Sequence, residues 1–162
     1  MTHPTTAAWR AAGEALDLDA AVATLADDVV LRSPLTERVR FEGRAEVADI
    51  LRAAFATVED IAYHTELGDD TTRALFYTAR VGDQPVEEAQ LIRLDADQRI
   101  SEVTFWLRPL PGTVAVMEGI GAALTRRRGG ERAARSLRRK LRPLIAMVGI
   151  ADRQGAKTAK PR

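Results

Sequence analysis

Four consecutive segments in the middle of the chain alternate apolar and polar residues, and this pattern limits the possible folds more than any other feature. The segments are residues 58–67, 72–81, 85–94 and 100–108. The connections between them include GDDTT, GDQP and DADQ and are rich in residues that favour tight turns. Because connections this short join neighbouring antiparallel strands, the pattern predicts a four-stranded antiparallel meander.

Helical patterns lie on both sides of this meander. We expect three N-terminal helices, at residues 6–16, 17–26 and 44–55. We also expect two short strands, at residues 29–31 and 38–43. Helices that precede the strands as a group indicate an α+β fold. After residue 110, two further apolar helical stripes separated by RRRGG predict a C-terminal helical extension.

The composition excludes several kinds of site. Cysteine is absent, and the only histidines are His3 and His64. Disulfides, thiolate sites and multi-histidine metal sites are therefore excluded, and we expect no metal and no other cofactor. The N-terminal MTHPTTAAWR has neither the basic nor the apolar region of a secretory signal, and no apolar run approaches the ~18 residues of a spanning helix. We therefore expect a cytoplasmic protein.

The charge is divided sharply along the chain. Residues 1–123 contain 11 basic and 21 acidic side chains, a net charge of −10, whereas residues 124–162 contain 13 and two, a net charge of +11. The favoured interpretation is that the basic helices pack on the acidic body or on a second copy. Docking on an anionic membrane is an alternative, because a basic helix with an apolar stripe has the required composition. We expect no nucleic-acid partner, because no aromatic residue is interleaved with the arginines.

Three stretches carry a resemblance to a known family: GEALDLDAAVATLADDVVLRSP, FEGRAEVADILRAAF and EEAQLIRLDADQRISEVTFWLRPL. In order and spacing they resemble the SnoaL-like branch of the nuclear transport factor 2-like superfamily. The resemblance implies an α+β cone, in which a curved antiparallel sheet wraps around the N-terminal helices and leaves a pocket at its open end. We expect this cone over residues 1–110, a basic amphipathic helical extension over 111–150 and a disordered tail over 151–162.

The superfamily includes ketosteroid isomerases, polyketide cyclases and binding modules without catalysis. Ketosteroid isomerase uses an Asp base together with a Tyr and a protonated Asp as hydrogen-bond donors. By resemblance, these three positions fall on Ser33, Trp9 and Gln90 respectively. A serine without a nearby imidazole is too weak a base to abstract the proton. The sequence therefore predicts that ketosteroid isomerase chemistry is absent.

Strand alternation identifies the residues that would face the pocket. If Gln90 points inward, so do Glu88 and Ile92 on the same strand. The full set of expected pocket-lining residues is Trp9, Ser33, Tyr77, Gln90, Ile92, Val103, Phe105 and Leu107. Most of these side chains are apolar, which favours a small apolar ligand.

Glu88 and His64 are the candidate catalytic residues. Burial would raise the pKa of Glu88 towards neutrality, as general-base catalysis requires. If Glu88 instead lies solvated at the mouth of the cone, it has no catalytic role. His64 adjoins Tyr63, and alternation turns one of the two inward. The favoured function is ligand binding with weak or no catalysis. A pocket-facing Glu88 would favour the alternative, a SnoaL-like cyclase or isomerase that uses Glu88 or His64 as its base.

Trp106 is expected on the outer face of the sheet. A large aromatic side chain exposed there favours cover by another surface. The resemblance implies a homodimer through this face, and the C-terminal helices are the alternative cover. A third functional alternative is a dimeric peripheral membrane or scaffold protein that docks through its basic C-terminal helix.

Overall fold

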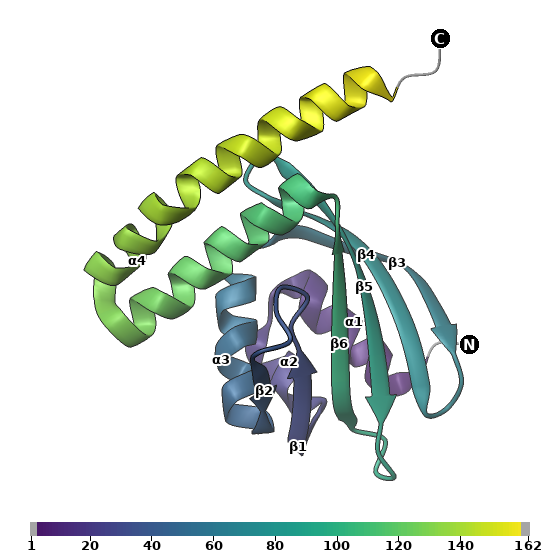
Figure 1. Ribbon diagram of the computed structural model, residues 1–162. Helices are drawn as coiled ribbons and strands as arrows, with labels where there is room; N and C mark the ends of the chain where they lie inside the picture. Colours follow the sequence, from purple (N-terminus) through teal and green to yellow (C-terminus); the bar gives the residue numbers. More distant parts are fainter. Residues whose placement is uncertain (1–2, 160–162) are drawn as a thin grey trace.

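The computed structural model describes residues 3–159 and has an α+β architecture built on one curved six-stranded sheet (Figure 1). The elements, in chain order, are α1 (Pro4–Ala15), α2 (Leu18–Ala23), β1 (Leu25–Arg32), β2 (Arg40–Glu42), α3 (Gly43–Phe55), β3 (Glu59–Gly68), β4 (Thr72–Val81), β5 (Gln84–Leu94), β6 (Ile100–Arg108) and α4 (Leu110–Thr158). The strand order across the sheet is β2-β1-β6-β5-β4-β3. Helices α1, α2 and α3 pack on the sheet, and α4 crosses the end of the cone above them (Figure 1).

The predicted meander is confirmed. Strands β3 to β6 pair with their sequence neighbours in antiparallel register, and their bounds agree with the sequence pattern to within one residue. Strand β1 extends the sheet by pairing in parallel with β6, and β2 forms the edge by pairing antiparallel with β1. The register sets Tyr77 of β4 and Leu107 of β6 on either side of Glu88 of β5.

The second helix and the first strand differ from expectation. Helix α2 ends at Ala23, and β1 begins at Leu25, four residues before the predicted start of the strand at residue 29. Leu25 is fully buried and pairs with Ile100 of β6. This long-range pairing draws residues with a helical local pattern into the sheet, because tertiary contacts override weak helix propensity.

The core lies between the helices and the concave face of the sheet. Trp9 of α1 and Val47 of α3 meet strand residues such as Leu75, Ile92 and Val103 in one buried cluster. Along β5, residues alternate between buried and more exposed positions, with Glu88, Gln90 and Ile92 on the buried side. The predicted sidedness of this strand is therefore confirmed.

Helix α4 is a helical hairpin rather than one straight rod. Its two arms, defined here as the first arm (residues 110–129) and the second arm (residues 131–158), meet at Gly130, whose φ of 76° is non-helical. This bend occurs within the predicted RRRGG break. The first arm packs closely on the cone: a Cβ added to Gly119 would lie 2.2 Å from Thr57 Cγ2. Only a glycine permits such a close approach at this position.

The end of the chain is more ordered than the sequence indicated. The structure continues α4 through Pro143 and as far as Thr158, so helix replaces the predicted disorder over residues 151–158. Residues 160–162, the last part of that predicted tail, lie outside the described residues. No helix in the described range is both long and apolar enough to cross a membrane.

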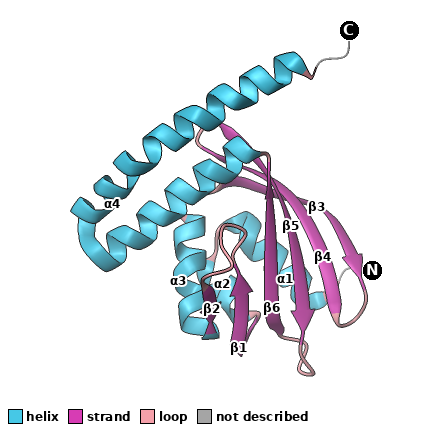
Figure 2. Cartoon of the chain, viewed as in Figure 1, coloured by secondary structure: helices cyan, strands magenta, loops and turns pink. Residues whose placement is uncertain are grey.

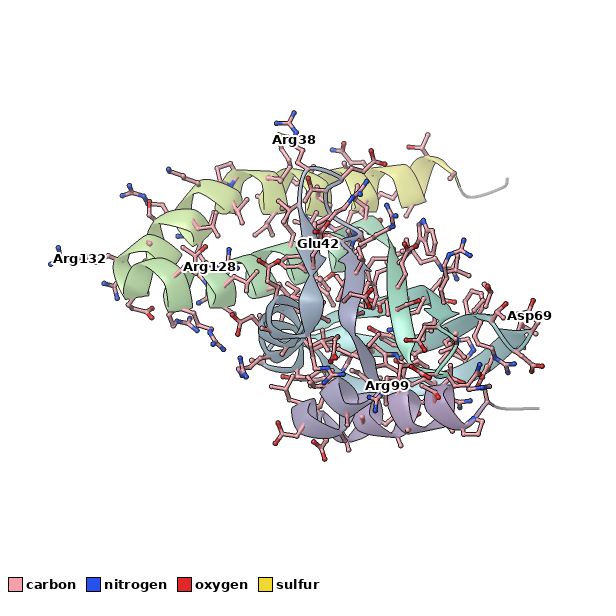
Figure 3. The ribbon with its side chains drawn as sticks, turned by 90° about the horizontal axis from the view of Figure 1, so that it is seen from below. Arg38, Glu42, Asp69, Arg99, Arg128 and Arg132 are labelled. Carbon is pink, nitrogen blue, oxygen red and sulfur yellow. The ribbon has the colours of Figure 1, made fainter. Side chains whose placement is uncertain are left out.

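The basic side chains of α4 make little contact with the acidic body. Within residues 3–159, one ion pair joins them, from Arg127 Nη2 to Asp49 Oδ1 at 3.1 Å. Arg126 and Arg135 pair instead with Glu131 of α4 itself. Figure 3 shows Arg132 projecting away from the cone. The helix therefore packs on the cone through its apolar stripe, as expected, whereas its arginines are exposed and, apart from Arg127, do not pair with the acidic body within the described residues. Packing of the basic helices on a second copy stays a prediction.

Candidate functional site

A cavity of about 90 Å³ lies at the wide end of the cone. Its walls come from helices α1, α2 and α3, from all six strands, from the first arm of α4 and from the connection between β1 and β2, the loop that rises towards α4 in Figure 2. Most of the lining side chains are apolar, and among the described residues that line the cavity Glu88 has the only carboxyl group. The site is therefore an apolar chamber with one ionisable acid in its wall.

Seven of the ten residues expected in the pocket or in catalysis line this cavity: Trp9, Ser33, Tyr77, Glu88, Gln90, Phe105 and Leu107. Ile92 and Val103 point to the same side of the sheet, but both are fully buried in the core and do not line the cavity. The cause is their position further along the strands, where the helices already fill the cone.

His64 lies outside the cavity. Its side chain is exposed on β3, and its Nδ1 lies 2.9 Å from Thr65 Oγ1. The inward member of the Tyr63–His64 pair is Tyr63, which lines the cavity. The structure thus corrects the interpretation of His64 as a base facing the pocket. Alternation with Ile61, which also lines the cavity, is the signal that could have identified Tyr63.

A chain of hydrogen bonds fixes the polar wall. Trp9 Nε1 donates to Gln90 Oε1 at 2.9 Å, and Tyr63 Oη donates to the same oxygen at 3.1 Å. Since an indole N–H is only a donor, Trp9 must face the amide oxygen of Gln90, and the amide nitrogen must face the other way. That nitrogen donates to Glu88 Oε1 at 3.0 Å. Helix α1 therefore controls, through Gln90, how the carboxyl group of Glu88 is held.

Burial raises the pKa of Glu88 to about 7. Only 7% of the residue is exposed, and removal from water disfavours the charged form. Hydrogen bonds from Gln90 and Tyr77 oppose this effect by stabilising the carboxylate, but burial dominates. Near neutral pH, Glu88 therefore has comparable populations of its acid and its carboxylate.

The two tyrosines beside Glu88 remain protonated. Burial is the largest cause that raises the pKa of Tyr63 and of Tyr77, and the nearby charge of Glu88 acts in the same direction. Their rings are tilted against each other, with centroids 4.9 Å apart. Both hydroxyl groups are therefore hydrogen-bond donors at neutral pH.

Helix α4 supplies part of the cavity wall. Val116 and Ile120 of the first arm line the cavity, and Val116 is 4% exposed. Sequence analysis missed both residues because their apolar stripe indicates only that the helix packs somewhere. Leu35, from the connection between β1 and β2, was missed because no periodic pattern covers this segment.

The chain is similar to known proteins in both sequence and fold. The SnoaL-like domain family matches residues 6–103, and no curated protein matches. A steroid delta-isomerase from Pseudomonas aeruginosa is 32% identical, with a TM-score of 0.69 over 75% of this chain and 89% of that chain. A protein with a cystatin-like fold from Silicibacter pomeroyi is 25% identical, with a TM-score of 0.71 over 75% of this chain and 85% of that chain.

A third structure is similar in fold alone. It is a protein with a ketosteroid isomerase-like fold from Catenulispora acidiphila, 16% identical, with a TM-score of 0.58 over 75% of this chain and 95% of that chain. The family match ends at residue 103, within β6, so it covers most of the cone and leaves α4 outside it. The sheet order, the N-terminal helices and the match over residues 6–103 together show that this chain belongs to the SnoaL-like domain family, with the nuclear transport factor 2-like fold.

Proposed function

We propose that the cavity binds a small, mainly apolar molecule that carries a carbonyl group, and that Glu88 exchanges a proton with it as a general acid–base. The observation that carries this proposal is the burial of Glu88 in the wall of an apolar cavity, where its pKa is about 7. A general base works best when its pKa lies near the working pH. Among residues 3–159, no cation contributes to the electrostatics of Glu88, so within this part of the chain its burial is not that of an ion pair.

The proposed step is a proton transfer next to the carbonyl group. The carboxylate of Glu88 takes a proton from the adjacent carbon, and the C–H electron pair moves to leave an enolate with its charge on the carbonyl oxygen. If the substrate has a C=C bond beyond that carbon, Glu88, now protonated, returns the proton to the far carbon of this bond, and the double bond shifts into conjugation with the re-formed carbonyl group. Without such a bond the proton returns to the same carbon, and the result is exchange with solvent. In the free site the single donor hydrogen of Tyr63 goes to Gln90 Oε1 and that of Tyr77 goes to Glu88. To stabilise the enolate oxygen, one of these protonated hydroxyls exchanges that partner for the substrate.

The similar steroid delta-isomerase supports the reaction class rather than the substrate. Ser33 stands where the resemblance places the catalytic base, and the carboxylate of this chain comes from β5 instead. The cavity of about 90 Å³ is also smaller than the ~300–1,000 Å³ of typical ligand pockets. We therefore infer that the substrate is smaller than a steroid.

Ligand binding without catalysis is the second candidate. It is favoured by the hydrogen bonds that Gln90 and Tyr77 already make to Glu88, because these satisfy the carboxyl group without a substrate. The two candidate functions differ in whether Glu88 must ionise. Catalysis requires its ionisation, whereas binding requires only its shape and polarity.

The experiment is ligand-detected exchange of hydrogen for deuterium. A panel of small cyclic ketones and enones is screened for binding by calorimetry, and each ligand that binds is incubated with protein in D₂O and followed by NMR. Glu88→Gln should retain affinity but lose ~10²–10⁴-fold in exchange rate. The matched control is Glu87→Gln, which alters the neighbouring residue on the other face of β5.

The outcomes separate the candidates. Exchange that depends on Glu88 supports the catalytic proposal. Binding in the cavity without any exchange above buffer would overturn catalysis and leave the binding function. If no member of the panel binds the cavity, and Val116→Ala does not create binding, both candidates fail.

A further inference from the structure

The second arm of α4 has two apolar faces, and only one of them packs on the first arm. The inner face includes Ala134, which is 1% exposed, and Leu137, which approaches Gly121 of the first arm. The outer face carries Leu144, Met147 and Ile150, which are 38%, 65% and 48% exposed. A soluble helix needs only the inner stripe to pack, so the outer apolar side chains need another explanation.

These exposed side chains lie on one side of the helix. Lys140, Pro143, Leu144, Met147 and Ile150 are spaced at i, i+3, i+4, i+7 and i+10, which brings them to the same face. Residues 143–151 contain no charged side chain, and all of them belong to the helix. The second arm also runs along the outer edge of the molecule, with no other element beyond it (Figure 1).

The exposed apolar residues are next to a dense basic segment. Residues 132–151 include six basic side chains and no acidic one. Arg132, Arg139 and Pro143 follow one another at helical spacing, so basic and apolar groups continue along the same outer face. Among the ion pairs of the described residues, only Arg135 of these six has a partner, Glu131 at 4.0 Å. The partner of this surface must therefore offer negative charge and an apolar phase together.

We propose that the outer face of the second arm docks on an anionic lipid bilayer surface, with Leu144, Met147 and Ile150 in the acyl boundary and the basic residues at the headgroups. A bilayer supplies both kinds of contact, and basic residues near an anionic leaflet add to apolar insertion. Nucleic acid would neutralise the arginines but leave the three apolar side chains in water. A second copy that met this face with its own would bring two basic segments together, which is repulsive.

The test is co-sedimentation of the full chain with vesicles of phosphatidylcholine alone and of phosphatidylcholine mixed with phosphatidylserine. We expect binding to the mixed vesicles only, and weaker binding as salt is raised. Removing two charges with Arg139→Gln and Lys140→Gln should weaken binding ~25-fold, since each basic residue contributes a factor of roughly five. Met147→Ser with Ile150→Ser should weaken it by at least about tenfold.

The control removes the same two charges from the cone, with Arg52→Gln and Arg99→Gln. Both residues are exposed at other parts of the molecule, and this variant should bind vesicles as the parent does. Thermal melts establish that each variant is folded. Equal binding to both vesicle types, equal loss in the control variant, or no vesicle binding would overturn the proposal. The proposal would also be overturned if light scattering showed that Met147→Ser dissociates a dimer. Tight binding to duplex DNA that Met147→Ser leaves unchanged would overturn it as well.

Discussion

Replacing Glu88 with glutamine preserves the shape of the side chain but removes the group that ionises in the cavity wall. The glutamine oxygen can accept from Gln90, and its amide can donate to the Tyr77 hydroxyl, so the hydrogen-bonded wall is retained. The variant therefore isolates the cost of burying a charge at this position.

The magnitude follows from the pKa of Glu88. Its ordinary value is 4.5, and burial raises the folded-state pKa to about 7. Between these pH values the folded protein holds a proton that the unfolded chain has released, so the free energy of unfolding falls as pH rises. The slope is about 1.4 kcal/mol per pH unit, which gives a total of about 3 kcal/mol by pH 8. Glutamine does not titrate, so its free energy of unfolding lacks this loss. Between pH 4 and pH 8, the free energy of unfolding of Glu88→Gln should therefore rise by about 3 kcal/mol relative to that of the parent.

The assay is urea unfolding of the parent and of Glu88→Gln across this pH range. Other groups titrate equally in both proteins, so the difference between the two curves reports on position 88 alone. For a chain of this length, about 3 kcal/mol corresponds to roughly 6–12 °C in Tm. Glu87→Gln, on the opposite face and paired with Arg108, should show no such gain. If the curves for Glu88→Gln and the parent run parallel, Glu88 is solvated and the catalytic proposal loses its basis.

Three further predictions concern the cavity and the sheet. Trp9→Phe removes the donor that orients the Gln90 amide and should lower the free energy of unfolding by about 1–3 kcal/mol in urea melts; an unchanged midpoint would contradict the proposed role of this bond. Val116→Ala enlarges the cavity from the α4 side and should shift ligand preference in a calorimetric panel towards bulkier molecules, whereas an unchanged preference would mean that α4 does not limit size. Trp106, 53% exposed on the outer face, should hold a homodimer, so that Trp106→Lys yields monomers by light scattering without loss of Tm; a persistent dimer would point to another interface.

Local periodicity determined much of this fold. The side chains of a strand alternate between two faces whatever the strand pairs with, and short turns join antiparallel neighbours. The pattern of residues 58–108 therefore specified the meander, and the alternation along β5 specified that Glu88 and Gln90 share the inner face. The same alternation predicted that Trp106 lies on the outer face, where it is exposed. The sequence also predicted the break at RRRGG, because adjacent glycines interrupt a helix at low cost.

Only the tertiary structure decided what surrounds these residues. The pKa of Glu88 depends on burial by α1, by α3 and by Val116 and Ile120 of α4, which are distant from it in sequence. The orientation of the Gln90 amide depends on Trp9, 81 positions away. The outward direction of the basic side chains depends on which stripe of α4 the cone covers. Periodicity specifies the face on which a side chain lies, whereas burial and charge depend on the elements that close over that face, and only the folded chain brings those together.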